Sequence, residues 1–260
     1  REYSESSSLG AANYKLASTD PDTSIGTYSF CMCPGGYVLN ATTSPNLTIC
    51  NGMSNYNRNS PFGNAAIVVS IDHDKMFGAK NIFGGLKYRT DLETRAYQAA
   101  TGSPIDSTSY KISNASDQQQ PLQSQRLPGQ NLMDFLEGKK PKGDLLKNSS
   151  LSGAVPASLH QILPKEIYQS LVQGLMEFNK SMRGFIHEEA QLFGVESRTS
   201  CPVRVTRDKD SLESVSHQGL YPCGEGAGYA GGITSAACDG VRIAEKIAAQ
   251  LLSQFESLEF

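Results

Sequence analysis

A glycine-rich run near the C-terminal end contains the residue types best suited to chemistry. It covers residues 219–233 and includes the peptide Gly-Glu-Gly-Ala-Gly-Tyr-Ala-Gly-Gly-Ile from Gly224 to Ile233. The pattern predicts a short strand, a glycine loop and the first turn of a helix. A helix start carries unpaired backbone N–H groups and a partial positive charge, and glycine lets a ligand approach the backbone closely. Such a start favours an anionic or electron-rich ligand, and Glu225 can accept hydrogen bonds from ligand hydroxyl groups.

Two well-known glycine motifs do not fit this run. A phosphate-binding loop requires a Lys followed by Ser or Thr after the glycines, and no such Lys is present. A dinucleotide-binding first turn requires Gly-x-Gly-x-x-Gly with an acidic residue about 20 positions further on, and Gly224–Gly228 does not match that register. The spacing alone leaves two interpretations open, namely a ligand-binding helix start and a tight turn that packs a helix onto a sheet.

Two of the six cysteines, Cys31 and Cys33, are one residue apart. In a strand, both side chains would point to the same face. One interpretation is a redox pair, and the other, which we favour, is two small residues packed in a β-rich domain, since free cysteine behaves as a buried apolar residue. Cys201, Cys223 and Cys238 occur singly, and the four histidines have no partner at ligand spacing. The sequence therefore predicts no metal site.

Composition narrows the possible classes of protein. The 260 residues are 38% hydrophobic and 19% charged, as in a globular protein, with a net charge of −3. This charge argues against a bulk electrostatic interaction with nucleic acid. No apolar run is long enough to span a bilayer. We therefore expect neither a nucleic-acid partner nor a membrane span.

Local patterns predict the elements that would position these residues. The first 75 residues indicate short strands and long loops, and residues 164–182 have the apolar spacing of a helix that begins near Pro164. An apolar stripe predicts a long final helix, with Ile233, Ala237, Val241, Ala244, Ala248, Leu251 and Phe255 on one face. The other expected strands are 26–30, 37–39, 47–50, 65–71, 193–207 and 220–222, and the other helices are 92–100 and 131–136. Residues 103–128 and 138–150 are expected to be loops.

The glycine run resembles the last FAD-contacting motif of flavoproteins in the glutathione-reductase-like superfamily. More closely, the chain resembles the FAD-dependent dehydrogenases of bacteria and plastids. Other matching stretches are residues 9–16, 28–36, 51–54 and 195–200. The resemblance extends from near residue 9 to near residue 250 and is weakest over 75–160.

This resemblance implies roles for individual residues. Glu225 would bind the ribityl chain of FAD, and the backbone at Gly232 and Ile233 would face the pyrimidine edge of the flavin ring. Arg198 could lie over the flavin and bind an anionic substrate group, or it could form a surface ion pair with Glu196. Cys31 and Cys33 are further catalytic candidates. The complete set of expected FAD contacts is Gly224, Glu225, Gly226, Gly228, Tyr229, Ala230, Gly231, Gly232 and Ile233.

The expected architecture is α/β, a FAD/NAD(P)-binding flavoprotein fold without the N-terminal strand–Gly-x-Gly-x-x-Gly–helix segment that binds the ADP half of FAD. Residues 1–190 would form a substrate domain, β-rich over 1–100 and helical over 125–190. Residues 191–260 would form the C-terminal part of the FAD-binding domain.

The resemblance implies a FAD-dependent oxidoreductase that transfers electrons or hydride between the flavin and a small-molecule substrate, donor or acceptor. The missing FAD-binding segment would belong to the same protein, and the chloroplast stroma or the cytoplasm is the expected compartment. Two alternatives stay open. One is a non-catalytic interaction module that kept the fold and lost the cofactor, and the other is a thiol redox protein that uses Cys31 and Cys33.

Overall fold

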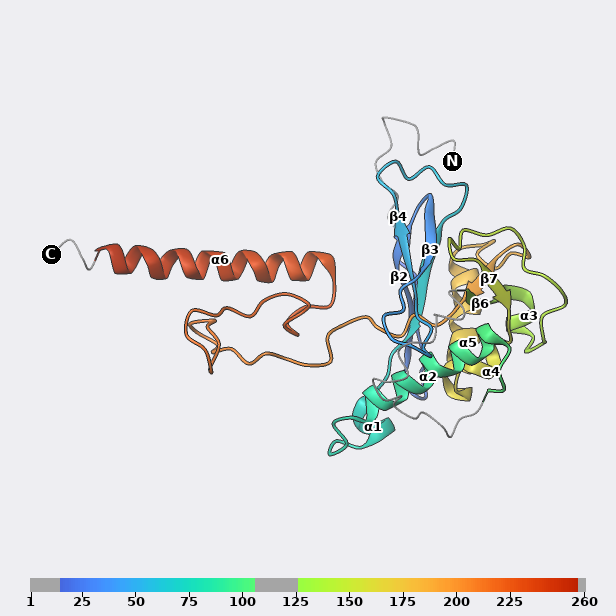
Figure 1. Cartoon of the computed structure of the whole chain (residues 1–260), viewed down its shortest axis with the longest axis horizontal. Helices are drawn as coiled ribbons and strands as arrows, with labels where there is room; N and C mark the ends of the chain where they lie inside the picture. Colours follow the sequence, from blue (N-terminus) through green and yellow to red (C-terminus); the bar gives the residue numbers. More distant parts are fainter. Residues whose placement is uncertain (1–14, 106–125, 257–260) are drawn as a thin grey trace. The chain divides into compact units, whose positions relative to one another are not determined.

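The structure is a computed structural model that describes residues 15–105 and 126–256. The chain divides into two compact units, Arg1–Ser197 and Arg198–Phe260, and each is considered by itself. Within the described ranges, the first unit contains strands β1–β8 and helices α1–α5, and the second contains helix α6 (Figure 1). The predicted mixed α/β class is confirmed. The assignment of residues 191–260 to a FAD-binding domain stays a prediction.

Two small antiparallel sheets form the N-terminal part of the first unit. One has the order β1-β2-β5 and the other pairs β3 with β4. The register of β2 against β5 shifts between Phe30 and Cys33, where Cys31 has a φ of +51°. The strands are β1 (Ala17–Thr19), β2 (Gly26–Cys33), β3 (Gly36–Asn40), β4 (Cys50–Ser54) and β5 (Asn64–Val69).

A third sheet and the helices complete the first unit. The sheet has the order β7-β6-β8, with β7 parallel and β8 antiparallel to β6. Its strands are β6 (Leu127–Asn131), β7 (Ala154–Pro156) and β8 (Gln191–Phe193). The helices are α1 (His73–Phe77), α2 (Gly84–Thr101), α3 (Leu132–Leu136), α4 (Leu159–Ile162) and α5 (Lys165–Ser181).

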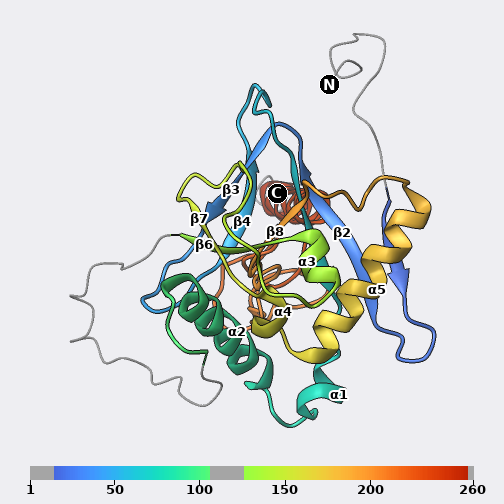
Figure 2. The same cartoon turned by 90° about the vertical axis from the view of Figure 1, so that its right-hand side faces the viewer.

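The main core of the first unit lies where helix α5 meets the β1-β2-β5 sheet and the shorter helices. Pro164 directly precedes α5, a position at which a missing N–H costs nothing because the first N–H groups of a helix have no partner within it. Leu175 and Phe178 are buried, as their helical spacing predicts. Figure 2 shows α5 crossing β2, and the Thr27 hydroxyl of β2 donates to the Ser170 carbonyl at 3.1 Å.

Several predicted boundaries in the first unit are wrong. Helix α2 begins at Gly84 rather than near residue 92, and strand β4 begins at Cys50 rather than at residue 47. Helix α5 ends at Ser181, one residue before the end of the expected range. Local patterns missed these limits because the α2 sequence has only a weak amphipathic pattern and the strand limits depend on which neighbour accepts the backbone hydrogen bonds. The expected loop over 103–128 lies largely outside the described residues.

The second unit consists of a long loop followed by helix α6 (Ile233–Glu256). The predicted strand over 193–207 is wrong beyond Phe193, and the predicted strand over 220–222 is wrong throughout. Among the described residues 198–256, the only strand-like pairing is the isolated bridge between Arg207 and Ser214. A strand needs a neighbour for its N–H and C=O groups, and this unit supplies none.

The predicted apolar stripe of α6 is not covered within its own unit. Ile243, which is not in the stripe, is buried, whereas the stripe residues Val241 and Leu251 are 58% and 49% exposed. The face that contacts the loop is centred near Ile243, roughly a third of a turn away from the predicted stripe. Helix α6 thus has a narrow face packed within its unit and a second, exposed apolar face beside it.

None of the helices in the two described ranges combines the length and apolar character needed to cross a lipid bilayer.

The packing of α5 on β2 predicts the sign of a substitution. A Cβ atom at Gly174 would lie 2.4 Å from Thr27 Cγ2, whereas one at Gly240 in α6 would meet no atom within 4 Å. Replacing glycine by alanine favours an isolated helix by about 1 kcal/mol, but overpacking typically costs about 1–3 kcal/mol. We expect Gly174→Ala to lower the free energy of unfolding in urea and Gly240→Ala to leave it equal or higher. Stabilisation by both substitutions would contradict the α5–β2 contact.

Candidate functional site

The first half of the glycine run is a tight turn in the second unit. Gly224 and Gly228 have φ values of +69° and +82°, a region that glycine adopts without steric cost. The Gly228 N–H donates to the Glu225 carbonyl at 2.9 Å, and the Tyr229 N–H donates to the Gly224 carbonyl at 3.0 Å. A Cβ atom at Gly228 would also lie 2.5 Å from the Val203 carbonyl oxygen. These two glycines are therefore required by the chain's own geometry.

The side chain of Tyr229 holds this turn against the preceding loop. Its hydroxyl group accepts the Arg207 N–H and donates to the Val205 carbonyl, each at 3.0 Å. The Arg207 guanidinium carbon lies 3.7 Å from the ring centroid, and that of Arg204 lies 5.0 Å from it. The Tyr229 side chain is thus engaged within the chain. The contact of Tyr229 with FAD stays a prediction, and the backbone of Tyr229 would have to make it.

Several positions of the glycine run are open to solvent. Glu225, Gly226, Gly231 and Gly232 are exposed, and Ile233 is 89% exposed. A Cβ atom at Gly226 would meet nothing within 4 Å, and one at Gly232 would meet only Ser235 Oγ at 3.7 Å. Neither glycine is needed for packing within the chain, so the close approach that they permit is available to a ligand.

Helix α6 begins directly after Gly232, at the end of the glycine run, as the sequence predicts. Ser235 Oγ accepts the Gly232 N–H at 3.2 Å and donates to the Gly232 carbonyl at 3.0 Å. The Ala236 N–H donates to Gly232 at 2.9 Å as the first bond of the helix. The N–H groups at 233–235 belong to the first turn, where a helix has no internal acceptors for them. Sequence reasoning missed Ser235, although a serine two residues after the start of a predicted helix is a recognisable signal.

Two further residues that sequence reasoning missed connect the run to the rest of the unit. Arg207 and Asp239 form a double hydrogen bond, with Nη1–Oδ2 at 2.9 Å and Nη2–Oδ1 at 2.7 Å. This pairing lowers the pKa of Asp239 to about 2 and raises the pKa of Arg207. No local pattern could identify the pair, because its members are far apart in sequence.

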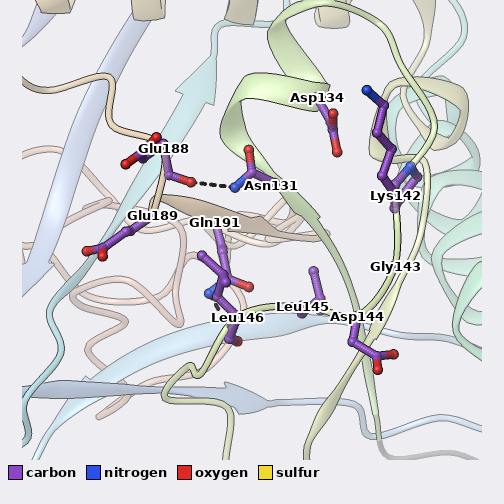
Figure 3. Close-up of a pocket in the computed structure, with 11 residues that line it drawn as sticks. Asn131, Asp134, Lys142, Gly143, Asp144, Leu145, Leu146, Glu188, Glu189 and Gln191 are labelled. Atoms are coloured by element: carbon purple, nitrogen blue, oxygen red, sulfur yellow. Dashed lines mark hydrogen bonds between the residues drawn. The ribbon is translucent and has the colours of Figure 1, made fainter.

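The first unit contains an open cavity of about 420 Å³ beside helix α3 and strand β8 (Figure 3). Its wall includes four carboxylates, and Lys142 provides one positive charge. The Asn131 side-chain amide donates to the Glu188 carbonyl at 2.6 Å and holds two sides of the cavity together. The lining residues are Asn131, Asp134, Pro141, Lys142, Gly143, Asp144, Leu145, Leu146, Glu188, Glu189 and Gln191.

A buried carboxylate fixes the end of the first unit. Glu93 in α2 is fully buried, accepts the Ser197 hydroxyl at 2.7 Å and lies 3.4 Å from Arg89 Nε. Sequence analysis did not single out Glu93, because an acidic residue within a helix is usually exposed. Arg198 follows directly and is exposed. Its role over a flavin stays a prediction.

The cysteines differ in environment. All six are free thiols, with Cys31 exposed and Cys33 partly buried. The irregular register of β2 and the positive φ of Cys31 interrupt the regular alternation, so the expectation that Cys31 and Cys33 share one strand face does not hold. Burial, assisted by the negative charge of Glu196, raises the pKa of the Cys50 thiol to about 12. Within the described residues, no group of three or more His, Cys, Asp or Glu side chains could hold a metal ion.

Comparison with known proteins identifies the class to which the chain belongs. A family model described as "FAD-dependent protein, C-terminal domain-like" matches residues 1–199. The chain belongs to this family, which supports an association with FAD. The matched range includes the whole first unit and ends before the glycine run.

One relative is an uncharacterized protein of Clostridium beijerinckii. It is 36% identical over 239 residues, which are 92% of this chain and 41% of the relative. The chain therefore spans less than half the length of that relative.

The residues of the glycine run fit a flavin. Gly226 and Gly232 leave the space that a planar ring or its ribityl chain needs, and Glu225 carries an exposed carboxylate for hydroxyl groups. The start of α6 supplies N–H groups suited to carbonyl oxygens on the ring edge or to negative charge on a reduced flavin. These hydrogen-bonding groups are thus compatible with FAD, the cofactor in the family's description.

Cysteine modification tests the described environments. Alkylation requires an accessible thiolate, and the Cys50 thiol is buried with a pKa of about 12. With iodoacetamide at about pH 8, close to the ordinary thiol pKa, we expect rapid modification of Cys31, Cys223 and Cys238 and none of Cys50. Peptide mass spectrometry would measure this, with a urea-denatured sample as the control in which Cys50 reacts. Equal rates for Cys50 and Cys31 in the native protein would contradict the packing around β4.

Proposed function

We propose that this chain is part of a FAD-dependent oxidoreductase of the bacterial and plastid dehydrogenase type, and that its glycine run closes the flavin site. The observation that carries the proposal is the exposure of two glycines of the run that the packing of the chain does not require. Gly226 and Gly232 have no packing partner that requires glycine, and both are exposed, with Gly232 directly before α6. The family membership and the predicted FAD/NAD(P)-binding fold support the same reading.

The chain's own residues would hold the cofactor in two ways. The carboxylate of Glu225 would accept hydrogen bonds from the ribityl hydroxyls. The backbone at Gly232 and Ile233 would face the pyrimidine edge of the ring, with the Ile233 N–H in the unpaired first turn of α6. A bound flavin supplies the capacity to accept and return electrons or hydride. The positive end of α6 favours negative charge on the reduced ring and so raises its electron affinity.

The remaining FAD contacts belong to residues outside this sequence. The run lacks the glycine fingerprint that binds a pyrophosphate. The matched relative has 59% of its length outside the aligned segment (100 − 41). The substrate, or the electron donor or acceptor, would be a small molecule, as the family resemblance implies.

The first test is Gly232→Val in the full-length protein. A branched side chain at residue 232 would fill the space assigned to the ring, so we expect at least a tenfold loss of FAD affinity, which corresponds to about 1.4 kcal/mol. Titration followed by flavin fluorescence measures the affinity. Gly240→Val is the matched control, because its side chain would also enter open space but lies on α6 away from the run. Equal FAD affinity in both variants and the parent would identify the run as a packing turn.

The second test is Glu225→Ala. Removing a charged acceptor costs about 1.5–3 kcal/mol, so FAD should bind about ten- to hundredfold more weakly. The flavin that does bind should still be reducible, since the start of α6 is retained. Glu245→Ala, which removes an exposed carboxylate from α6, should leave the affinity unchanged. An unchanged affinity in Glu225→Ala, with circular dichroism equal to the parent, would exclude the ribityl role.

A further inference from the structure

The Arg207–Asp239 pair is one of the least exposed ionic contacts in the described residues. The side chains are 6% and 12% exposed. Burying two charges is costly unless their geometry is good and their remaining hydrogen-bonding groups are satisfied. Both conditions hold, because the contact is a parallel double hydrogen bond and each partner also bonds the backbone. We call these two backbone hydrogen bonds the surplus bonds of the pair, and their positions indicate its role.

Both surplus bonds end on the segment that opens the glycine run. Asp239 Oδ2 accepts the Gly224 N–H at 3.0 Å, and Arg207 Nη1 donates to the Pro222 carbonyl at 2.8 Å. Asp239 lies in the second turn of α6, so these bonds tie residues 222–224 to the helix that begins at Ile233. The Gly224 carbonyl is also bonded, to the Tyr229 N–H. The backbone on both sides of Gly224 is therefore fixed directly before Glu225.

We propose that Asp239 and Arg207 are positioning residues that hold the glycine run in register with the start of α6, so that Glu225 and the backbone at 232–233 reach one flavin together. This inference rests on the proposed function. Neither side chain needs to touch the cofactor. Their contribution is pre-organisation, since a binding constellation has to be held close to its productive geometry before the ligand arrives.

The ion pair also gives the arrangement a defined pH dependence. The folded-state pKa of Asp239 is about 2, below its ordinary value of 3.8. The contribution of the ionised Asp239 to the stability of the fold is therefore fully present above about pH 4. It is lost as the pH falls through about 2 and Asp239 becomes protonated. The groups that face Asp239 are Arg207, the Gly224 N–H and Arg242, and all of them favour the ionised carboxylate. The pair thus stays intact throughout the neutral range.

The test compares Asp239→Asn with Asp239→Glu and with Glu245→Gln. The first keeps the shape and removes the charge, the second keeps the charge, and the third removes an exposed carboxylate from the same helix. Amide hydrogen exchange of peptides covering residues 222–232 is measured in the 260-residue chain, and FAD affinity is measured in the full-length protein. Arg207→Lys, which keeps the charge and loses the double hydrogen bond, replaces Asp239→Asn if that variant does not fold.

We expect Asp239→Asn to exchange faster at residues 222–232, to keep the parent exchange in the first unit, and to bind FAD at least tenfold more weakly. Asp239→Glu should recover most of the affinity, and Glu245→Gln should match the parent. Parent-like exchange at residues 222–232 in Asp239→Asn would overturn the proposal, and so would parent-like FAD affinity with faster exchange. If the parent binds no FAD, the proposed function fails, and positioning for a flavin fails with it. Faster exchange in Asp239→Asn would then establish only the structural link.

Discussion

The double hydrogen bond between Arg207 and Asp239 has the role in the second unit that strand pairing has in the first. In the three small sheets, backbone N–H and C=O groups bond those of a neighbouring strand. The described loop before α6 has only one isolated bridge and scattered backbone bonds, so side chains bond several of its remaining backbone groups. Asp239 accepts an N–H, Arg207 donates to a carbonyl, and the Tyr229 hydroxyl does both. A loop bonded in this way can hold a defined shape without a sheet.

This arrangement separates rigidity from access. The turn from Gly224 to Tyr229 is held from the side of the loop and helix, while Gly226, Gly231 and Gly232 stay exposed. A cofactor site needs both properties. A flexible loop would lose conformational entropy when the cofactor binds, and a fully packed loop would leave no space for the cofactor. The exposed start of α6 adds an electrostatic preference for electron-rich groups that requires no charged side chain.

The sequence identified the elements whose signal is local. The spacing of Leu175 and Phe178 predicted α5, and the glycines ending at Gly232 predicted the start of α6. Alternation predicted β2, and strand-like composition predicted β3 and β5. The failures are non-local. Residues 194–207 have strand-like composition but no partner strand in the unit, and the burial of Glu93 depends on Ser197, which is distant in sequence. The Arg207–Asp239 contact could not be read from either segment alone. The composition of the α6 stripe was right, but no sequence pattern could indicate that it is exposed.

The glycines of the run fall into two kinds that natural variation would treat differently. Gly224 and Gly228 are required by backbone conformation, and Gly228 also by the nearby Val203 carbonyl. They would be retained in any descendant that keeps this turn, whatever it binds. Gly226 and Gly232 have no such requirement within the chain. In a lineage that lost its cofactor, drift would reach these two positions first, so substitutions there beside intact glycines at 224 and 228 would mark a protein that kept the fold after its chemistry had gone.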